Sequence, residues 1–546
     1  MTTNIVLDPP AGASADGEGP DGFLSLLHAE WTKFRTVRGW VIWMVVGLLL
    51  FVFVGVFAAG NANIGCVNGR GQQKSGPACL PYVPTGPGGE AVIDDFYFVR
   101  KPLTGDGTIT ARVTSLTGMR AAGNSHVAAG GPGSGQQGPP MRRGLVPWAK
   151  AGIIIKASTR QGSAYAAMMA TGGHGVRMQF NFTGDIAGLP GLPTASAPRW
   201  LRLVREGDVI TGYDSADGTH WTKVGVVSLA GLPSTVQVGF FAASPTFVHI
   251  SPFFGGASLQ AGPSVATAVF DHVRLSGAGS SGRWVGDAVG GREGPMGRAS
   301  SGFRVSGPRL TLTGSGDVAP AVPGPGNGFP SATIEQSLAG GFVGLIAIIA
   351  VAAVFFTAEY RRGLIRTTLA ASPRRGRVLA AKSVVIGLVA FAVGLIGAAV
   401  SVPLGVRRES AEGLYVLPVS ALTEVRVIVG TAALLALAAV FAVALGAALR
   451  RSAAAITAGI VAIVMPFLLA ALGVFPLGVS DWLLRLTPAA GFAVQQSIPQ
   501  YPQINKVYTT VGGFYPLPPL AGFAVLCAWV AAAVLVAVYV LRRRDA

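Results

Sequence analysis

The sequence predicts a polytopic α-helical membrane protein with six transmembrane helices and an all-β sandwich as an extracytoplasmic insert. Half of the 546 residues are hydrophobic and only 12% are charged, whereas a soluble chain has about a quarter charged residues. Apolar residues dominate 338–541, but 60–337 is polar and rich in Gly and Pro. Within that polar region, several stretches alternate apolar and polar residues as half-buried strands do. The chain therefore divides into a membrane part and a β-rich part.

The N-terminal 39 residues are expected outside the hydrocarbon core. Residues 1–22 are polar, acidic and rich in Pro and Gly, which predicts a disordered tail. They lack the basic start and short apolar core of a cleavable signal peptide. Residues 23–39 carry apolar side chains at helical spacing, which predicts an amphipathic helix in the membrane interface. The alternative is a basic flank of the first membrane helix.

Six uncharged apolar runs are long enough to cross a membrane, which takes roughly 20 residues. They are 40–59, 338–357, 384–403, 427–449, 453–475 and 520–541. In hydrocarbon a helix satisfies its own backbone hydrogen bonds, so each run is predicted to be a transmembrane helix.

Lys and Arg set the expected orientation, since they favour the cytoplasmic side. With the N-terminus inside, the inner segments carry 15 of them and the short outer loops four. We therefore expect a plasma-membrane protein with both termini cytoplasmic, 542–546 being a short cytosolic tail, and 60–337 outside the cell.

The region outside the cell is expected to have three parts. Residues 60–90 contain Cys66 and Cys79, and a disulfide between them is expected in an oxidising compartment. Residues 91–276 hold the predicted strands and a hairpin signal at Asp-Gly. Residues 277–337, rich in Gly, Pro and Ser with one short β-like stretch, are expected to be a tether or small appendage.

A series of short motifs runs through 91–276 in order. It includes GDGTITARV from Gly105, WAKAGIII from Trp148, WLRL from Trp200 and SADGTHW from Ser215. The series resembles bacterial concanavalin-like lectin/glucanase jelly rolls. The resemblance implies a jelly-roll sandwich but little about function, because that fold serves binding, catalysis and scaffolding.

Glycoside hydrolysis by this region is not expected. Retaining glycosidases need two carboxylates about 5 Å apart. Asp94 and Asp95 are adjacent and so point to opposite faces of a strand, while Asp214 and Asp217 flank a turn. The sequence therefore predicts no enzyme, and its scattered histidines predict no metal site.

Three aromatic residues of the region could stack on a sugar: Trp200, Tyr213 and Trp221. A sandwich core uses the same residue types, and the core interpretation is favoured over a glycan contact.

The membrane part is compared with three classes: a transporter, a tethered binding protein and a membrane enzyme. A tether needs one or two helices, and an intramembrane enzyme needs polar catalytic groups at depth. An ion-driven transporter places ionisable residues within its helices, whereas these runs contain none. A transporter driven from elsewhere is the remaining interpretation.

The inner loop 358–383 is the most informative segment. It contains Glu-Tyr-Arg-x-Gly from Glu359, a Ser-Pro-Arg turn at Pro373 and seven basic residues within 358–382. Together with AEWTKFRTVR from Ala29, this loop resembles the type-2 ABC exporter permeases, over 23–59 and 336–546. In that family the loop docks on the ATPase subunit. The resemblance implies a coupling interface formed by Glu359, Tyr360, Arg361, Arg362, Gly363, Arg366, Pro373, Arg374 and Arg375. The large insert departs from the family pattern.

One motif in this loop is misleading. Gly376–Ser383 differs from a P-loop by Ala381 in place of the second Gly, but it leads directly into a membrane helix rather than following a strand. The chain is therefore expected to bind no cofactor, with ATP and Mg held by a partner subunit.

The expected function is a permease subunit of an ABC-2-type exporter. Its expected partners are a separate ATP-binding subunit, a second permease half (identical or related), the lipid bilayer and a cell-wall glycan, but no nucleic acid. The resemblance also implies re-entrant helices in the outer loop 476–519, with a plain surface loop as the alternative. The alternative function is a glycan-binding sensor or assembly protein that retains a permease-like membrane domain.

Overall fold

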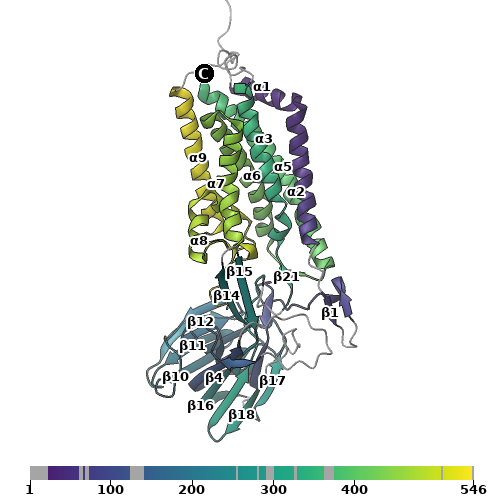
Figure 1. Cartoon of the computed structure of the whole chain (residues 1–546). Coiled ribbons are helices and arrows are strands. Elements are labelled where there is room, and N and C mark those ends of the chain that lie inside the picture. Colours follow the sequence, from purple (N-terminus) through teal and green to yellow (C-terminus); the bar gives the residue numbers. More distant parts are fainter. Residues whose placement is uncertain are drawn as a thin grey trace, which may run out of the picture.

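A computed structural model describes residues 23–60, 65–67, 73–122, 140–253, 256–278, 282–290, 301–324, 329–361, 374–505 and 508–543. A helical bundle and a β-sandwich lie end to end (Figure 1). We call the end of the bundle that carries the sandwich proximal and the opposite end, where α1 lies, distal. The predicted disordered tail 1–22 lies outside the described residues.

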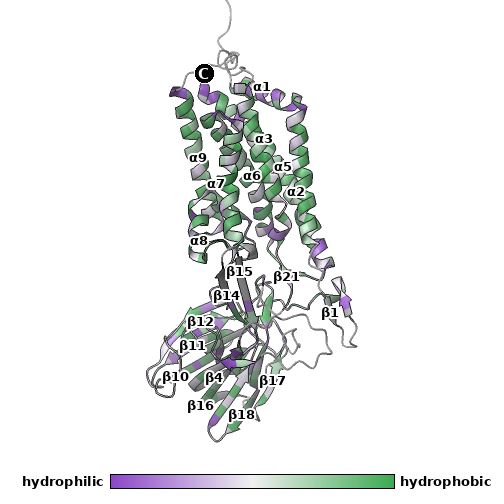
Figure 2. Ribbon diagram, in the orientation of Figure 1, coloured by the Kyte–Doolittle hydropathy of each residue, from purple (hydrophilic) through white to green (hydrophobic). Residues whose placement is uncertain are grey.

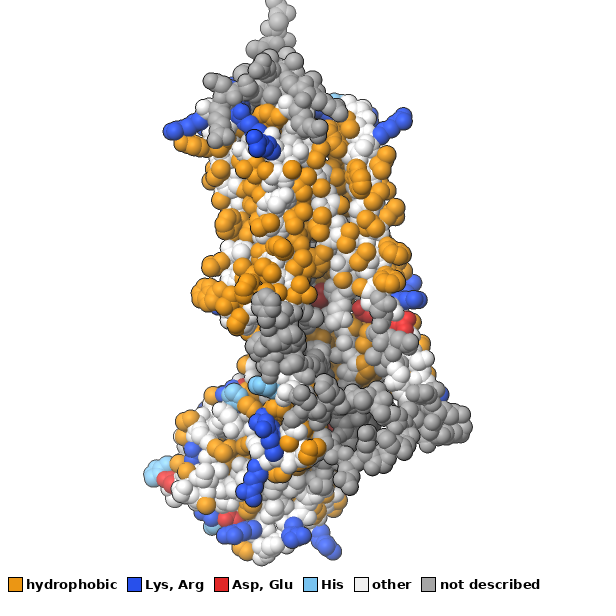
Figure 3. Space-filling model, viewed as in Figure 1, with side chains coloured by type: hydrophobic (Ala, Val, Ile, Leu, Met, Phe, Trp, Pro, Cys, Tyr) orange, Lys and Arg blue, Asp and Glu red, His pale blue; other side chains and the backbone are white. Residues whose placement is uncertain are grey.

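The described residues contain six helices long and apolar enough to cross a membrane, as predicted. They are α2 (Arg38–Ala59), η2 with α3 (Ile334–Leu338 and Gly341–Arg361), α5 (Arg375–Ala411), α6 (Ala421–Leu449), α7 (Ser452–Ala471) and α9 (Pro519–Arg543). On the face of the bundle seen in Figures 2 and 3, apolar residues form a belt between charged ends. The chain is thus a multi-pass membrane protein. α5 exceeds its predicted run because charged turns containing Lys382 and Glu409 continue the helix at both ends.

The predicted amphipathic helix is α1 (Phe23–Thr36), which lies across the distal end (Figure 1). Its Phe34 is buried and meets the ring of Phe355 in α3 edge-on, with 6.1 Å between centroids. Trp40, at the start of α2, contacts the same ring at 4.9 Å. Aromatic packing therefore fixes α1 against the bundle.

The sandwich consists of two layers that share β4 (Phe96–Ala121). The first half of β4 pairs with β13 and β17, and its second half with β10 and β16. One layer contains β17 (Val285–Val289), β4, β13 (Thr235–Ala243), β6 (Lys150–Lys156), β7 (Tyr165–Thr171), β8 (Val176–Phe180) and β9 (Gly184–Ala187). The other contains β12 (Thr222–Ser228), β11 (Val209–Ser215), β10 (Arg199–Glu206), β4, β16 (Ser264–Ala278), β19 (Arg309–Gly314) and β18 (Gly302–Ser306). These pairings confirm the predicted antiparallel sandwich.

Two hydrophobic cores cover the first layer on its two faces. The core between the layers contains Ile153 and Phe240, and the core on the far face contains Ile154 and Phe241. β6 and β7 are therefore buried along their whole length, which is why they lack the alternation of a half-buried strand. The segment 277–337 was expected to be a tether or small appendage with one short β-like stretch, and its described part adds β17, β18 and β19 to the sandwich.

The sandwich is fastened to the bundle at several points. β3 (Val92–Asp94) pairs with β20 (Val318–Pro320), and β21 (Ser331–Ala332) pairs with β22 (Tyr415–Val416) between α5 and α6. Gln503 donates a hydrogen bond to the carbonyl of Thr183 at 3.0 Å. A hydrophobic cluster that includes Val83, Leu417, Ile498 and Phe514 fills this junction.

Shorter elements complete the described chain. Cys66 and Cys79 form a disulfide, with Cα atoms 5.5 Å apart, beside the ribbon of β1 (Gly65–Val67) and β2 (Gln73–Ser75). The hairpin of β14 (Phe247–Phe253) and β15 (Gly256–Gly262) points toward the bundle (Figure 1). The elements β5 (Met141–Arg143), η1 (Gly76–Cys79), α8 (Leu477–Leu486), η3 (Pro488–Gln495) and η4 (Thr510–Gly512) are the remainder. η3 is completely buried and packs against α6 and α9.

Candidate functional site

Four charged residues, three of them buried, form a cluster at the distal end. Lys382 Nζ lies 2.7 Å from a carboxylate oxygen of Glu30 and 2.7 Å from one of Glu359. Lys33 Nζ lies 2.8 Å from Glu30 and 3.1 Å from Glu359. The two carboxylates and two ammonium groups balance in charge, and together they join α1, α3 and α5. We call these residues the distal charge cluster.

Local helix geometry brings these groups together. Glu30 and Lys33 are three residues apart on α1 and so share a face. Glu359 lies in the last turns of α3 and Lys382 near the start of α5. Glu30 and Lys382 are each 1% exposed, and buried charges of this kind persist only when paired. Burial lowers the pKa of Lys33, but hydrogen bonds and charges from Glu30 and Glu359 outweigh it, and the pKa is raised.

The structure places some of the predicted coupling residues in or near this cluster. Glu359 belongs to it, and Tyr360 is half-buried under the guanidinium of Arg450, 5.2 Å from the ring centroid. Arg374 is exposed beside the first turn of α5, and Arg375 donates a 2.6 Å hydrogen bond to the carbonyl of Leu541 in α9. Arg361 is the last residue of α3. Arg362, Gly363, Arg366 and Pro373 lie outside the described residues.

Glu30, Lys33 and Lys382 were not identified as site residues from the sequence. Lys382 was recognised only as a positive charge at a membrane boundary. A usable signal was the i, i+3 pair of opposite charges on α1, whose apolar face must lie against the bundle. The P-loop-like run Gly376–Ser383 lies within α5, where the backbone N–H groups beyond the first turn are used by the helix.

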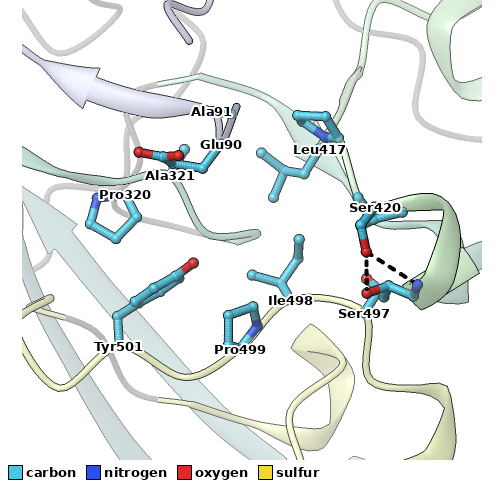
Figure 4. Close-up of a pocket in the computed structure, with 13 residues that line it drawn as sticks. Glu90, Ala91, Pro320, Ala321, Leu417, Ser420, Ser497, Ile498, Pro499 and Tyr501 are labelled. Atoms are coloured by element: carbon cyan, nitrogen blue, oxygen red, sulfur yellow. Dashed lines mark hydrogen bonds between the residues drawn. The ribbon is translucent and has the colours of Figure 1, made fainter. Parts of the chain in front are cut away.

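A second feature is a cavity of about 160 Å³ at the junction of bundle and sandwich. Figure 4 shows Glu90 and Tyr501 on one side of it and Ser420 and Ser497 on the other. Burial, followed by the nearby charge of Glu90, raises the pKa of Tyr501. The cavity combines an apolar wall with one carboxylate and several hydroxyls, a lining suited to a small polar or cationic group.

The predicted sugar-stacking residues are not part of the sandwich core. Trp200, Tyr213 and Trp221 are half-exposed and lie outside both hydrophobic cores, so the favoured core interpretation is wrong. Alternation along β10 explains this, because Leu201 and Leu203 occupy the inward positions.

The aromatic faces on this outer surface are already covered. The guanidinium of Arg202 lies 3.7 Å from the ring centroid of Trp221. Trp200 has Arg112 at 5.5 Å from its ring centroid, while the backbone of Gly218 packs against the ring. Sugar stacking on either tryptophan would require these neighbours to move.

Three of the carboxylates weighed for hydrolysis have other partners. Asp94 is buried against Lys156, with 2.7 Å between Oδ2 and Nζ. Asp214 is buried and accepts a 2.6 Å hydrogen bond from the backbone of Leu189. Asp217 lies in the exposed hairpin turn, where it binds His220.

Comparisons with known proteins give only distant likenesses. No protein-family model and no curated protein matches the chain. Among solved structures, scytalido-glutamic peptidase with a transition-state analog inhibitor aligns with 40% of this chain and 98% of its own, at 10% identity and a TM-score of 0.24. A functionally unknown protein from Saccharomyces cerevisiae aligns with 40% of this chain and 94% of its own, at 13% identity and a TM-score of 0.19. Likeness at this level says nothing about chemistry.

Proposed function

We propose that the chain is the membrane-spanning permease subunit of a type-2 ABC exporter, driven by a separate ATP-binding subunit. The distal charge cluster carries the proposal. Glu359 precedes the segment 362–373 and Lys382 follows it, and their side chains form a buried ion pair. A force applied to this segment would therefore move α3 and α5 together, with α1 attached to both through Glu30.

The source of energy follows from what the helices contain. The middle turns of the six membrane helices carry no charged residue, so the bundle offers no chain of ionisable groups for an ion gradient. The P-loop-like run lies inside α5 and so does not form a phosphate-binding loop. Under this proposal, the chain therefore receives work from a partner at the basic distal end. The proposed orientation places this end in the cytosol.

The sandwich would act at the exit of the pathway. It is fastened to the chain between α5 and α6 through β21 and β22, and to the chain before α9 through Gln503. Movement of those helices would carry the sandwich with them. We propose that a second permease half, identical or related, completes the pathway, and that the sandwich receives or covers the cargo there.

The test first seeks a neighbouring open reading frame with a Walker motif and then combines its product with the full chain in nanodiscs. We expect the chain to stimulate ATP hydrolysis, and R361E/R362E to return the rate to that of the ATPase alone. R542E/R543E makes the same charge change on α9 at the same end and should retain stimulation.

Equal loss or equal retention in both variants would contradict the proposed coupling interface. Retained partner binding in R361E/R362E, together with polysaccharide binding by the full chain, would instead favour the glycan-binding sensor.

A further inference from the structure

Two carboxylates with buried oxygens lie near each other at the proximal end of the bundle. Glu335 lies in η2, and Glu409 lies near the end of α5, where it is 2% exposed. Each acts on the other electrostatically, and one oxygen of each, Oε2, has no hydrogen-bond partner among the described residues. Buried polar atoms are almost always hydrogen-bonded or in contact with ordered water or an ion. These two oxygens therefore have capacity to accept a proton, a water molecule or a cation.

Helix packing places the two groups together. Gly405 and Glu409 are four residues apart and share a face of α5. Ser337 of η2 occupies the space that a side chain at Gly405 would fill, and its carbonyl lies against Gly55 of α2. Gly405 thus lets η2 lie directly on α5, and Gly55 lets it lie on α2, so that Glu335 is held near Glu409.

Hydroxyl groups complete the oxygen-rich surroundings. The hydroxyl of Ser337 faces Glu409, and that of Ser497 faces Glu335. Carboxylate and hydroxyl oxygens are ligands for hard metal cations rather than for soft ones. Ser497 also lines the junction cavity with Glu90 (Figure 4), so the group is adjacent to an opening.

The local charge fits a single positive ion. Arg426 of α6 faces Glu335 and donates a hydrogen bond to the carbonyl of Gln496, so two carboxylates and one guanidinium leave one negative charge. Arg408, on α5, lies against Gly60. The C-terminal end of α5 adds the negative pole of its helix dipole, which favours a cation. In addition, η2 is a short helix separated from α3, and transporters use broken helices of this kind to bind Na⁺.

We propose that Glu335 and Glu409, with the hydroxyls of Ser337 and Ser497, form a Na⁺ site next to the junction cavity. The site stands apart from the proposed transport function, because neither ATP nor a partner subunit is needed to occupy it.

The experiment measures thermal unfolding of the full chain in nanodiscs as NaCl replaces choline chloride at constant ionic strength. A ligand that binds only the folded state raises the midpoint with its concentration. We expect a saturable rise with NaCl that E335Q and E409Q abolish. The first control is E424Q, the same Glu-to-Gln change in the first turn of α6. The second is S401A, which removes a buried hydroxyl two turns before Glu409 on α5. Both should keep the rise.

If the glutamate variants do not fold, S337A tests the proposed Na⁺ site, because this change removes one oxygen ligand and no charge. It should shift the Na⁺ titration to higher concentration. No NaCl-specific rise, an equal rise in E409Q, or an unchanged titration in S337A would overturn the site. An equal rise with KCl, or a rise with CaCl₂ alone, would overturn its assignment to Na⁺.

Discussion

Lys156 Nζ lies 2.7 Å from Asp94 Oδ2, and neither side chain is exposed to solvent. Lys156 ends β6 and Asp94 ends β3. At the other end of β6, Lys150 pairs with Asp317 at 2.7 Å, next to β20. The two strands that lead from the sandwich toward the bundle are therefore tied to one central strand. Burial raises the pKa of Asp94 and lowers that of Lys156, against the attraction between them.

Replacing Asp94 by Ala should strongly destabilise the sandwich. The change leaves the Lys156 ammonium buried and unpaired, which costs about 3–5 kcal/mol of unfolding free energy. The control is D287A, which removes the half-exposed partner of Arg100 and should cost about 1 kcal/mol or less. Denaturant unfolding followed by tryptophan fluorescence measures both. Similar losses in the two variants would show that the buried pair does not hold β3.

Two adjacent glycines at the start of α3 should respond differently to substitution by Ala. A methyl group on Gly340 would overlap the carbonyl oxygen of Phe51 in α2, which is backbone and cannot turn aside. Overpacking of this kind costs about 1–3 kcal/mol. On Gly341 the methyl group would meet the ring of Phe51 at 3.4 Å, an ordinary contact. Thermal stability in detergent should fall for G340A and stay unchanged for G341A, and the reverse order would refute this packing.

Lys382→Met should release α1 from the bundle. It leaves the carboxylates of Glu30 and Glu359 to share one ammonium, that of the partly exposed Lys33, at a cost of about 3 kcal/mol or more. Lys33→Met removes an ammonium whose side chain is 42% exposed and should cost about 1 kcal/mol or less. Hydrogen exchange of the α1 amides reports the difference. Equal protection in both variants would mean that aromatic packing alone holds α1.

The hairpin turn of the sandwich should be pH-sensitive. The Nδ1 of His220 lies 2.6 Å from Asp217, and this hydrogen bond raises the pKa of His220 above its ordinary 6.5. Because the folded pKa is raised, the stabilisation is fully present below 6.5 and is lost as the pH rises through the higher value. NMR titration of the histidine rings should show this, and D217N should return His220 to an ordinary pKa. An unchanged titration in D217N would exclude the pair.

The sequence predicts those features that depend on local pattern. Membrane helices follow from uncharged runs, because each one satisfies its own backbone. Half-buried strands such as β8 follow from alternation. The strands β18 and β19 were predicted only as one short β-like stretch, and their place in the sandwich depends on the pairing of β19 with β16, about 45 residues earlier in the chain. Predicting that Trp200 lies on the outer face would have required knowing which side of β10 packs against the core.

Local sequence pattern could not predict which charged residues meet at the two ends of the bundle. Glu30 and Lys382 are separated by 352 positions, and nothing in either neighbourhood indicates the other. The same holds for Glu335 and Glu409, whose proximity depends on η2 lying on α5. Sequence pattern placed only Lys382 at a membrane boundary, and the fold shows which of these residues meet.

The multiple attachment of the sandwich has a practical consequence. A rigid body fixed to several helix ends turns a small rotation of those ends into a larger displacement at its far rim. A pair of fluorophores, one near the β18–β19 turn and one on α1, would therefore read the conformational cycle of the bundle from outside the lipid, without any label among the helices themselves.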